Sequence, residues 1–278
     1  MAGALTAARG RAPSAAPRVL FLATLWCLGG LLVAFIMLPL VRLTLATSPG
    51  ELVDAGQRSD VRAAIRLSLQ DAAVTAVVAA FLGVPLAFIL SRSVFPGQRF
   101  VEAIVDLPLA VPHSVVGIAL LFVFGRRGWI GAPADHIGIS FFGTQWGIVA
   151  GMLFVSAPFM VGSVRVALDA IDPRIERAAR SLGATRAYAF RRVTLPLAAR
   201  GIMTGLVLTY ARSISEFGAI VILAYYPMTA PVKAYDLYLQ NGLDASAAVS
   251  VLLLIVTLST FVVFRALASG QVRPLALR

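Results

Sequence analysis

The chain contains six apolar runs that are each long enough to cross a lipid bilayer. A crossing takes roughly 20 residues of α-helix, and a single helix satisfies its own backbone hydrogen bonds in lipid. A soluble domain carries roughly a quarter charged residues, whereas this sequence is 13% charged and 59% hydrophobic. The sequence therefore predicts an all-α integral membrane protein with six transmembrane helices. The runs lie at 19–44, 64–90, 101–124, 147–167, 201–225 and 247–267.

The predicted organisation has four parts. Residues 1–17, rich in Ala, Gly, Arg, Pro and Ser, are expected to form a disordered cytoplasmic tail. Residues 18–46 form the first transmembrane helix; its apolar run exceeds a signal-peptide core of roughly 7–15 residues, which favours an uncleaved span. Residues 60–268 form the transmembrane core, and the loop 168–200 lies within it.

Basic residues are unequally divided between the two sides of the predicted membrane. Sixteen fall on one side and seven on the other, which places both termini and the loop 168–200 in the cytoplasm. The richer side holds Arg9, Arg11, Arg18, Arg92, Arg99, Arg165, Arg174, Arg177, Arg180, Arg186, Arg191, Arg192, Arg200, Arg265, Arg273 and Arg278. Because these residues flank apolar runs, we expect membrane lipid and no nucleic acid as a partner.

The loop 168–200 carries helix signals of its own. Asp172 is a good N-cap, Pro173 fits the first helical position, and Gly183 supplies a C-terminal stop. An apolar stripe at helical spacing lies between them, formed by Ile175, Ala178, Ala179 and Leu182. Thr185 can cap a second short helix, which Pro196 is expected to end before the fifth span. A hairpin lying on anionic lipid is the alternative interpretation of this segment.

The fifth span carries ionisable residues at membrane depth, where each is a functional hypothesis by default. Gly205, Thr209, Arg212 and Glu216 are spaced to share one helical face, and Arg212 and Glu216 can pair at i and i+4. Either this stripe faces a water-accessible pathway, with Arg212 offering charge compensation to an anion, or the pair fixes helix packing. The residues assigned to the pathway are Thr209, Arg212, Ser215, Glu216, Gly218, Asp106 and His113.

The third span contains Asp106, Pro108, Pro112 and His113 in close succession. Two prolines four residues apart are expected to bend or break the helix. His113 has no second His or Cys nearby, so a hydrogen-bonded core histidine fits better than a metal ligand. No catalytic triad, metal cluster or nucleotide fold is recognisable, and we expect neither a cofactor nor enzymatic activity.

The loop resembles the signature loop of ABC importer permeases. The residues that carry this resemblance are Ala178, Ala179, Gly183, Val193, Leu195 and Pro196. At the acidic position of the family's Glu-Ala-Ala triplet this chain has Arg177, with Glu176 immediately before it, so the contact made there is expected to differ. The resemblance implies a type I importer permease fold in which the loop forms a coupling helix that docks into an ATP-hydrolysing subunit. The only lysine, Lys233, is not part of a P-loop, so ATP hydrolysis is expected from a separate chain.

A finer resemblance covers most of residues 60–268. The segments 211–219, 224–228 and 106–113 are similar to those of molybdate/tungstate importer permeases. The resemblance implies a homodimer in a bacterial or archaeal cytoplasmic membrane, two copies of an ABC ATPase subunit, and an extracytoplasmic solute-binding protein that delivers an oxyanion.

Three alternatives stay open at this point. The cargo could be sulfate or another anion. The chain could instead be a secondary transporter that uses Arg212, Glu216 and Asp106 as an ion relay, although no inverted repeat is visible. A membrane scaffold without transport is the third.

Overall fold

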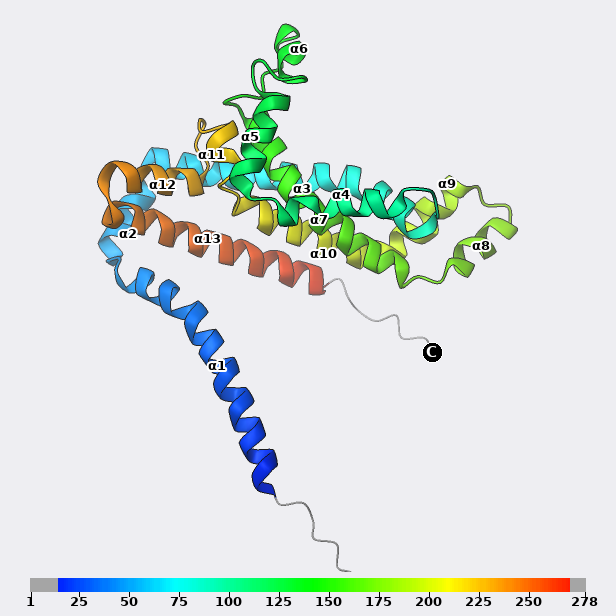
Figure 1. The fold of residues 1–278 in the computed structure, drawn as a ribbon, viewed down its shortest axis with the longest axis horizontal. Helices are drawn as coiled ribbons and strands as arrows, with labels where there is room; N and C mark the ends of the chain where they lie inside the picture. The colour runs from blue at the N-terminus through cyan, green and yellow to red at the C-terminus, as the bar shows by residue number, and fades with distance from the viewer. Residues whose placement is uncertain (1–14, 271–278) are drawn as a thin grey trace, which may run out of the picture. The chain divides into compact units, whose positions relative to one another are not determined.

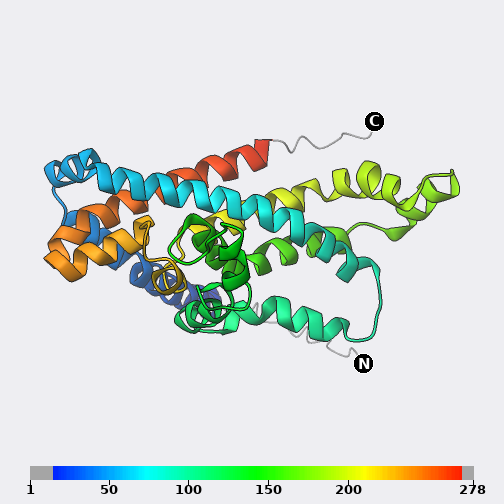
Figure 2. The same ribbon diagram turned by 90° about the horizontal axis from the view of Figure 1, so that it is seen from above.

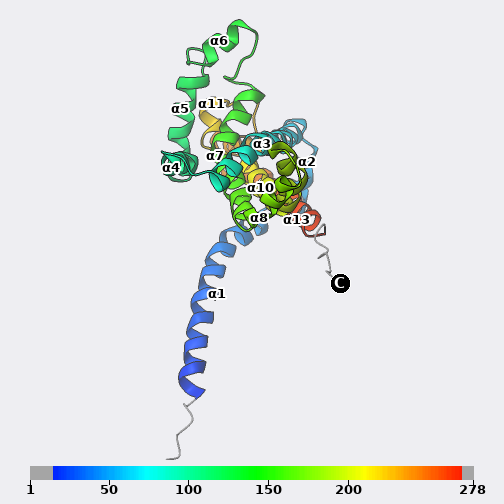
Figure 3. The ribbon, with the colours of Figure 1, turned by 90° about the vertical axis from the view of Figure 1, so that its right-hand side faces the viewer.

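The computed structural model describes residues 15–270, and every regular element in that range is a helix (Figures 1, 2 and 3). The chain divides into two units, residues 1–47 and residues 48–278. The first contains α1 (Ala15–Leu45), of which Phe21–Leu45 is long and apolar enough to cross a membrane. Of the tail 1–17, which sequence analysis treats as disordered, residues 1–14 lie outside the described residues and residues 15–17 begin α1.

The second unit contains the remaining helices. They are α2 (Pro49–Gln57), α3 (Ser59–Arg92), α4 (Gln98–Ala110), α5 (His113–Phe124), α6 (Gly131–His136), α7 (Gln145–Asp169), α8 (Pro173–Ser181), α9 (Arg186–Ala189), the π-helix η1 (Phe190–Thr194), α10 (Leu195–Ile214), α11 (Ile220–Leu223), α12 (Ala230–Asn241) and α13 (Leu243–Gly270).

Five helical segments of residues 15–270 are long and apolar enough to span a membrane, and a sixth span is broken. The broken span consists of α4 and α5, which meet at 117°. Val111, between them, has an extended backbone with ψ 132°, because the ring of Pro112 disfavours helical geometry in the residue before it. The two prolines, four residues apart, predict this break, and six spans result when the bent pair is counted as one.

The fifth span differs from its predicted bounds of 201–225. It runs from Arg186 through η1 and α10 and ends at Ile214. The predicted break at Pro196 is wrong, because this proline lies in the first turn of α10, where its missing N–H leaves no hydrogen bond unmade. The predicted helical face is also wrong at one end: Glu216 follows α10 in an irregular turn rather than continuing the helix.

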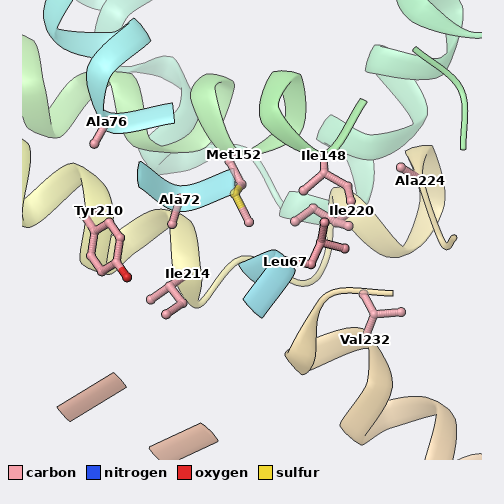
Figure 4. Close-up of a cluster of buried hydrophobic side chains, with 10 residues drawn as sticks. All are labelled: Leu67, Ala72, Ala76, Ile148, Met152, Tyr210, Ile214, Ile220, Ala224 and Val232. Carbon is pink, nitrogen blue, oxygen red and sulfur yellow. The ribbon is translucent and has the colours of Figure 1, made fainter. Parts of the chain in front are cut away.

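The core of the second unit forms where α3, α7 and α10 pack side by side. One buried cluster joins Leu67, Ala72 and Ala76 of α3 to Ile148 and Met152 of α7, with further residues from α10 to α12 (Figure 4). Small residues allow the helices to approach closely, as is common in membrane bundles. Where Gly205 faces Met160, an added Cβ would come within 2.8 Å of the sulfur atom.

Candidate functional site

Three ionisable side chains meet where the broken third span reaches the end of the fifth. Arg212 Nη2 donates to Glu216 Oε2 at 2.8 Å and lies 3.0 Å from both imidazole nitrogens of His113. His113 Nδ1 is 3.3 Å from the same Glu216 oxygen. We call these three residues the membrane triad. The Arg212–Glu216 pair is the one that sequence analysis expects, whereas His113 is half-buried and paired with charges rather than a buried core histidine.

The local chain path explains why the triad forms. His113 is the first residue of α5, directly after the break at Pro112, so the break brings its side chain to the end of α10. The other oxygen of Glu216, Oε1, accepts the backbone N–H of Ala219 at 2.9 Å. The lack of a side chain at Gly218 allows His113 to lie close to this turn, because a Cβ at position 218 would lie 2.8 Å from the Cβ of His113.

The three ionisable side chains of the triad differ in their exposure to solvent. The Glu216 side chain is 1% exposed, while those of Arg212 and His113 are 20% and 39% exposed. A carboxylate removed from water costs several kcal/mol unless it is paired and hydrogen-bonded, and here both oxygens have partners. The arrangement can therefore hold a guanidinium in one place while leaving part of it accessible to an anion.

The other residues assigned to the pathway divide into two groups. Ser215 adjoins the triad, with its hydroxyl 3.4 Å from Arg212 Nη1. Thr209 lies earlier on α10, fully buried, and its hydroxyl has no partner among residues 15–270. Asp106 is exposed on α4 and forms no ion pair with any described residue, so the structure does not bring it into the triad. No group of three or more potential metal ligands occurs in the described part of the chain.

The loop 168–200 has the caps that its sequence predicts. Asp172 accepts the backbone N–H of Arg174 at 2.8 Å, and Thr185 accepts that of Tyr188 at 3.2 Å. Gly183 has a φ of +94°, a conformation that only glycine adopts without strain. Because the caps and the glycine fix both helix ends, α8 is a defined element rather than a loose strand of chain.

The apolar stripe of α8 is left uncovered by the other residues of the range 15–270. Ile175 is 45% exposed and Leu182 is 91% exposed, and Tyr188 beyond the turn is 58% exposed. Ala178 is exposed and Ala179 is half-buried. An apolar surface of this kind, rimmed by charges, is typical of a docking site.

Glu176 and Arg177, neighbours in the sequence, differ in exposure and in pairing. Glu176 accepts from Arg92 Nε at 2.9 Å, and Arg92 Nη2 also donates to the carbonyl of Ile171 at 3.0 Å. This contact ties α8 to the end of α3. Arg177 is exposed. Arg92 was not singled out from the sequence, because an arginine at the cytoplasmic end of a span is what the orientation rule alone would place there.

A second polar network, also missed from the sequence, lies at the opposite end of α3. Lys233 Nζ is 3.0 Å from Asp60 and 3.7 Å from Asp236. The hydroxyl of Tyr225 donates to Asp236 at 2.8 Å, which raises the pKa of that phenol to about 12. Asp60, Lys233 and Asp236 line a cavity of about 590 Å³. The i and i+3 spacing of Lys233 and Asp236 was visible in the sequence, whereas the contact with the distant Asp60 was not.

Comparison with known proteins places these features in a family. Residues 79–270 match the family described as "Binding-protein-dependent transport system inner membrane component". The chain is 42% identical over 240 residues to the molybdate/tungstate transport system permease protein WtpB of Thermococcus kodakarensis, covering 86% of this chain and 92% of that protein. It is 37% identical over 202 residues to a probable sulfate transport system permease protein of Chlorokybus atmophyticus, covering 71% and 70%.

The fold is also similar to that of a solved transporter. The match is to a bacterial alginate ABC transporter in complex with a periplasmic protein that holds an alginate pentasaccharide. The TM-score is 0.74 at 19% sequence identity, over 95% of this chain and 97% of that chain. The family match over 79–270 and the 42% identity to WtpB show that the chain belongs to the inner-membrane permease components of binding-protein-dependent transport systems.

Proposed function

We propose that this chain is the membrane-spanning subunit of an ATP-driven importer for molybdate or tungstate. The observation that carries the proposal is its 42% identity, over most of both sequences, to a permease named for those two oxyanions. The structure supports it with a span-rich core and an exposed, capped docking helix in one chain.

The proposed complex contains two copies of this chain and two copies of an ABC ATPase subunit. One chain offers one coupling helix, and an ATPase dimer needs two, so a two-fold homodimer is the simplest arrangement. An extracytoplasmic solute-binding protein would deliver the oxyanion; the similar alginate transporter is bound to such a periplasmic protein. The excess of arginine on one side supports cytoplasmic termini and a cytoplasmic α8.

In this proposal α8 transmits the movement of the ATPase to the spans, and the membrane triad lines the translocation pathway. The exposed Ile175 and Leu182 would dock into a cleft of the ATPase, with Gly183, Leu195 and Pro196 fixing the geometry of the loop. Because Arg92 holds Glu176, a displacement of α8 would move the end of α3 with it. Alternating access would follow as the two coupling helices approach and separate.

The triad suits a conduit that must release its cargo. Glu216 already neutralises much of the charge of Arg212, so the guanidinium would attract an oxyanion weakly and transiently. Ser215 and Gly218 adjoin the triad, Thr209 lies earlier on α10, and these three residues complete the proposed pathway. Asp106 lies outside the triad, and its role in the pathway stays a prediction.

Uptake in a reconstituted system tests the proposal. The chain is placed in proteoliposomes with its ATPase subunit and its binding protein, and accumulation of labelled molybdate is followed with and without ATP on the side of the ATPase. We expect ATP-dependent uptake that tungstate competes for and sulfate does not. Uptake that proceeds without ATP would contradict the proposal and favour an ion-coupled transporter.

Sulfate is the second candidate cargo, because a relative named as a probable sulfate permease shares 37% identity with this chain. Calorimetric titration of the partner binding protein with molybdate, tungstate and sulfate separates the two. Preference for sulfate would replace the cargo in the proposal while leaving the permease role intact.

A further inference from the structure

A cavity of about 370 Å³ lies on the side of α8 opposite its apolar stripe. Pro173, Glu176, Arg177 and Arg180 recur at i, i+3, i+4 and i+7, so they share one face of the helix, and that face lines the cavity. Arg92 at the end of α3 and Arg186 at the start of α9 line it as well. We call this the loop cavity. It has room for about a dozen water molecules at roughly 30 Å³ each.

The loop cavity has an uncompensated positive charge. Of its four arginines, Arg92 is paired with Glu176, at 12% and 17% side-chain exposure. Arg177, Arg180 and Arg186 form no ion pair with any residue from 15 to 270. Three positive charges in one concavity repel one another and attract an anion more strongly than scattered surface charges do.

The chemistry of these side chains selects the kind of anion. A guanidinium presents N–H donors in a planar fork that matches phosphate and carboxylate oxygens, and it keeps its charge throughout the physiological range. The three free arginines come from two elements, two from α8 and one from α9, and all three line the same cavity. Among the residues that line the cavity, Glu176 has the one carboxylate that could compete with an anion for the arginines. That carboxylate already accepts a hydrogen bond from Arg92.

We propose that the loop cavity is a binding site for a phosphate group or another doubly charged tetrahedral oxyanion. Its position on the cytoplasmic side rests on the proposed function; its anion chemistry does not. A bound anion would neutralise the three free arginines, cross-link α8 to α9 and stiffen the turn at Gly183 between them. The site would therefore set how rigidly α8 presents its exposed apolar stripe.

Two sources could supply such a group, a free anion or the headgroup of an anionic lipid, and the experiment has one arm for each. In the first arm, the full-length chain in phosphatidylcholine nanodiscs is titrated with inorganic phosphate at constant ionic strength, with chloride as the balancing anion. In the second arm, its melting temperature is compared between nanodiscs of phosphatidylcholine alone and nanodiscs that also contain phosphatidylglycerol. No partner subunit and no transport are needed, so failure here leaves the importer proposal untouched.

The test variant is Arg177→Gln/Arg180→Gln/Arg186→Gln. The matched control is Arg191→Gln/Arg192→Gln/Arg200→Gln, which removes the same charge from exposed residues of η1 and α10 that do not line the cavity. Since the test variant removes three positive charges and their charge-assisted hydrogen bonds to the anion, we expect it to weaken phosphate binding at least about tenfold. The control should keep the wild-type affinity.

Each outcome decides the proposal. Saturable phosphate binding that only the test variant loses supports a free anion as the ligand. Stabilisation by phosphatidylglycerol that only the test variant loses supports a lipid headgroup. Absence of both effects in the wild-type chain overturns the proposal, as does equal loss in both variants.

Discussion

The membrane triad and the loop cavity both gather arginine side chains, but they treat the charge in opposite ways. Arg212 is held by a carboxylate that is 1% exposed, and that carboxylate is itself fixed by a backbone N–H. Arg177, Arg180 and Arg186 share a concavity without a free acid. An unpaired charge inside the membrane has a high free-energy cost, whereas at a water-facing surface a charged side chain can stay unpaired until a partner binds. The first region is complete within this chain and the second is built to meet something else.

Removing the acid of the triad should have the largest effect. Glu216→Ala leaves Arg212 and His113 without a carboxylate at an almost fully buried position, and breaking a buried pair costs about 3–5 kcal/mol. Unfolding in mixed micelles, followed by helical circular dichroism, measures the loss. Asp54→Ala on exposed α2 is the control and should change stability by less than about 0.5 kcal/mol. Equal stability of the two variants would mean that the triad does not hold the spans together.

Closing the space beside the triad should have the next effect. In Gly218→Ala the new Cβ meets the Cβ of His113 at 2.8 Å, and overpacking of this kind costs about 1–3 kcal/mol. Gly162→Ala is the matched control, because no atom outside its own helix lies within 4 Å of the added Cβ. Thermal unfolding in the same detergent compares them. A Gly218→Ala protein as stable as the control would show that α5 and the turn after α10 can separate freely.

The ion pair that links α8 to α3 should contribute a smaller free energy to stability, and this contribution can be measured separately. A double-mutant cycle of Arg92→Ala and Glu176→Ala isolates it, and a charge-assisted contact of this burial should give a coupling energy of about 1–2 kcal/mol. The exchange Arg92→Glu/Glu176→Arg should recover part of it. A coupling energy near zero would remove the proposed mechanical connection between α8 and the spans.

Neutralising the loop cavity should have the smallest effect on stability. Because its three free arginines repel one another and have no acidic partner, Arg177→Gln/Arg180→Gln/Arg186→Gln should change the unfolding free energy by less than about 0.5 kcal/mol in anion-free buffer. The same denaturation measurement on Arg212→Gln should show a clear loss. A comparable loss in both would erase the contrast between the two regions.

Sequence patterns predicted the local features of both regions well. Asp172, Gly183 and Thr185 start or end helices through contacts within three or four residues, so the residue types alone predict these roles. The confirmed break at Pro112 likewise depends only on the proline ring and the residue before it. The end of the fifth span was misplaced because the apolar run continues to Tyr225 although the helix stops at Ile214. Hydropathy does not distinguish a helix from a buried turn, so the irregular backbone around Glu216 escaped prediction.

Contacts between distant residues could not be read from the sequence. The pairing of His113 with Arg212 joins residues 99 apart, and that of Arg92 with Glu176 joins residues 84 apart. Both depend on how α3, α5, α8 and α10 pack. The loop cavity could not be predicted for the same reason: the sequence shows a basic loop, but it does not show that the end of α3 packs beside it and forms one wall of the cavity.

In the proposed transporter, movement reaches this chain through α8, and ATP hydrolysis takes place in a separate subunit. This coupling through α8 is tested most directly by measuring uptake and stimulated ATP hydrolysis together in reconstituted Gly183→Val. Gly97→Val is the control, because Gly97 also has a positive φ (+85°) and open surroundings but lies between α3 and α4. We expect Gly183→Val to uncouple hydrolysis from uptake and Gly97→Val to transport as the wild type does. Normal, substrate-stimulated hydrolysis with normal uptake in Gly183→Val would contradict the proposed coupling.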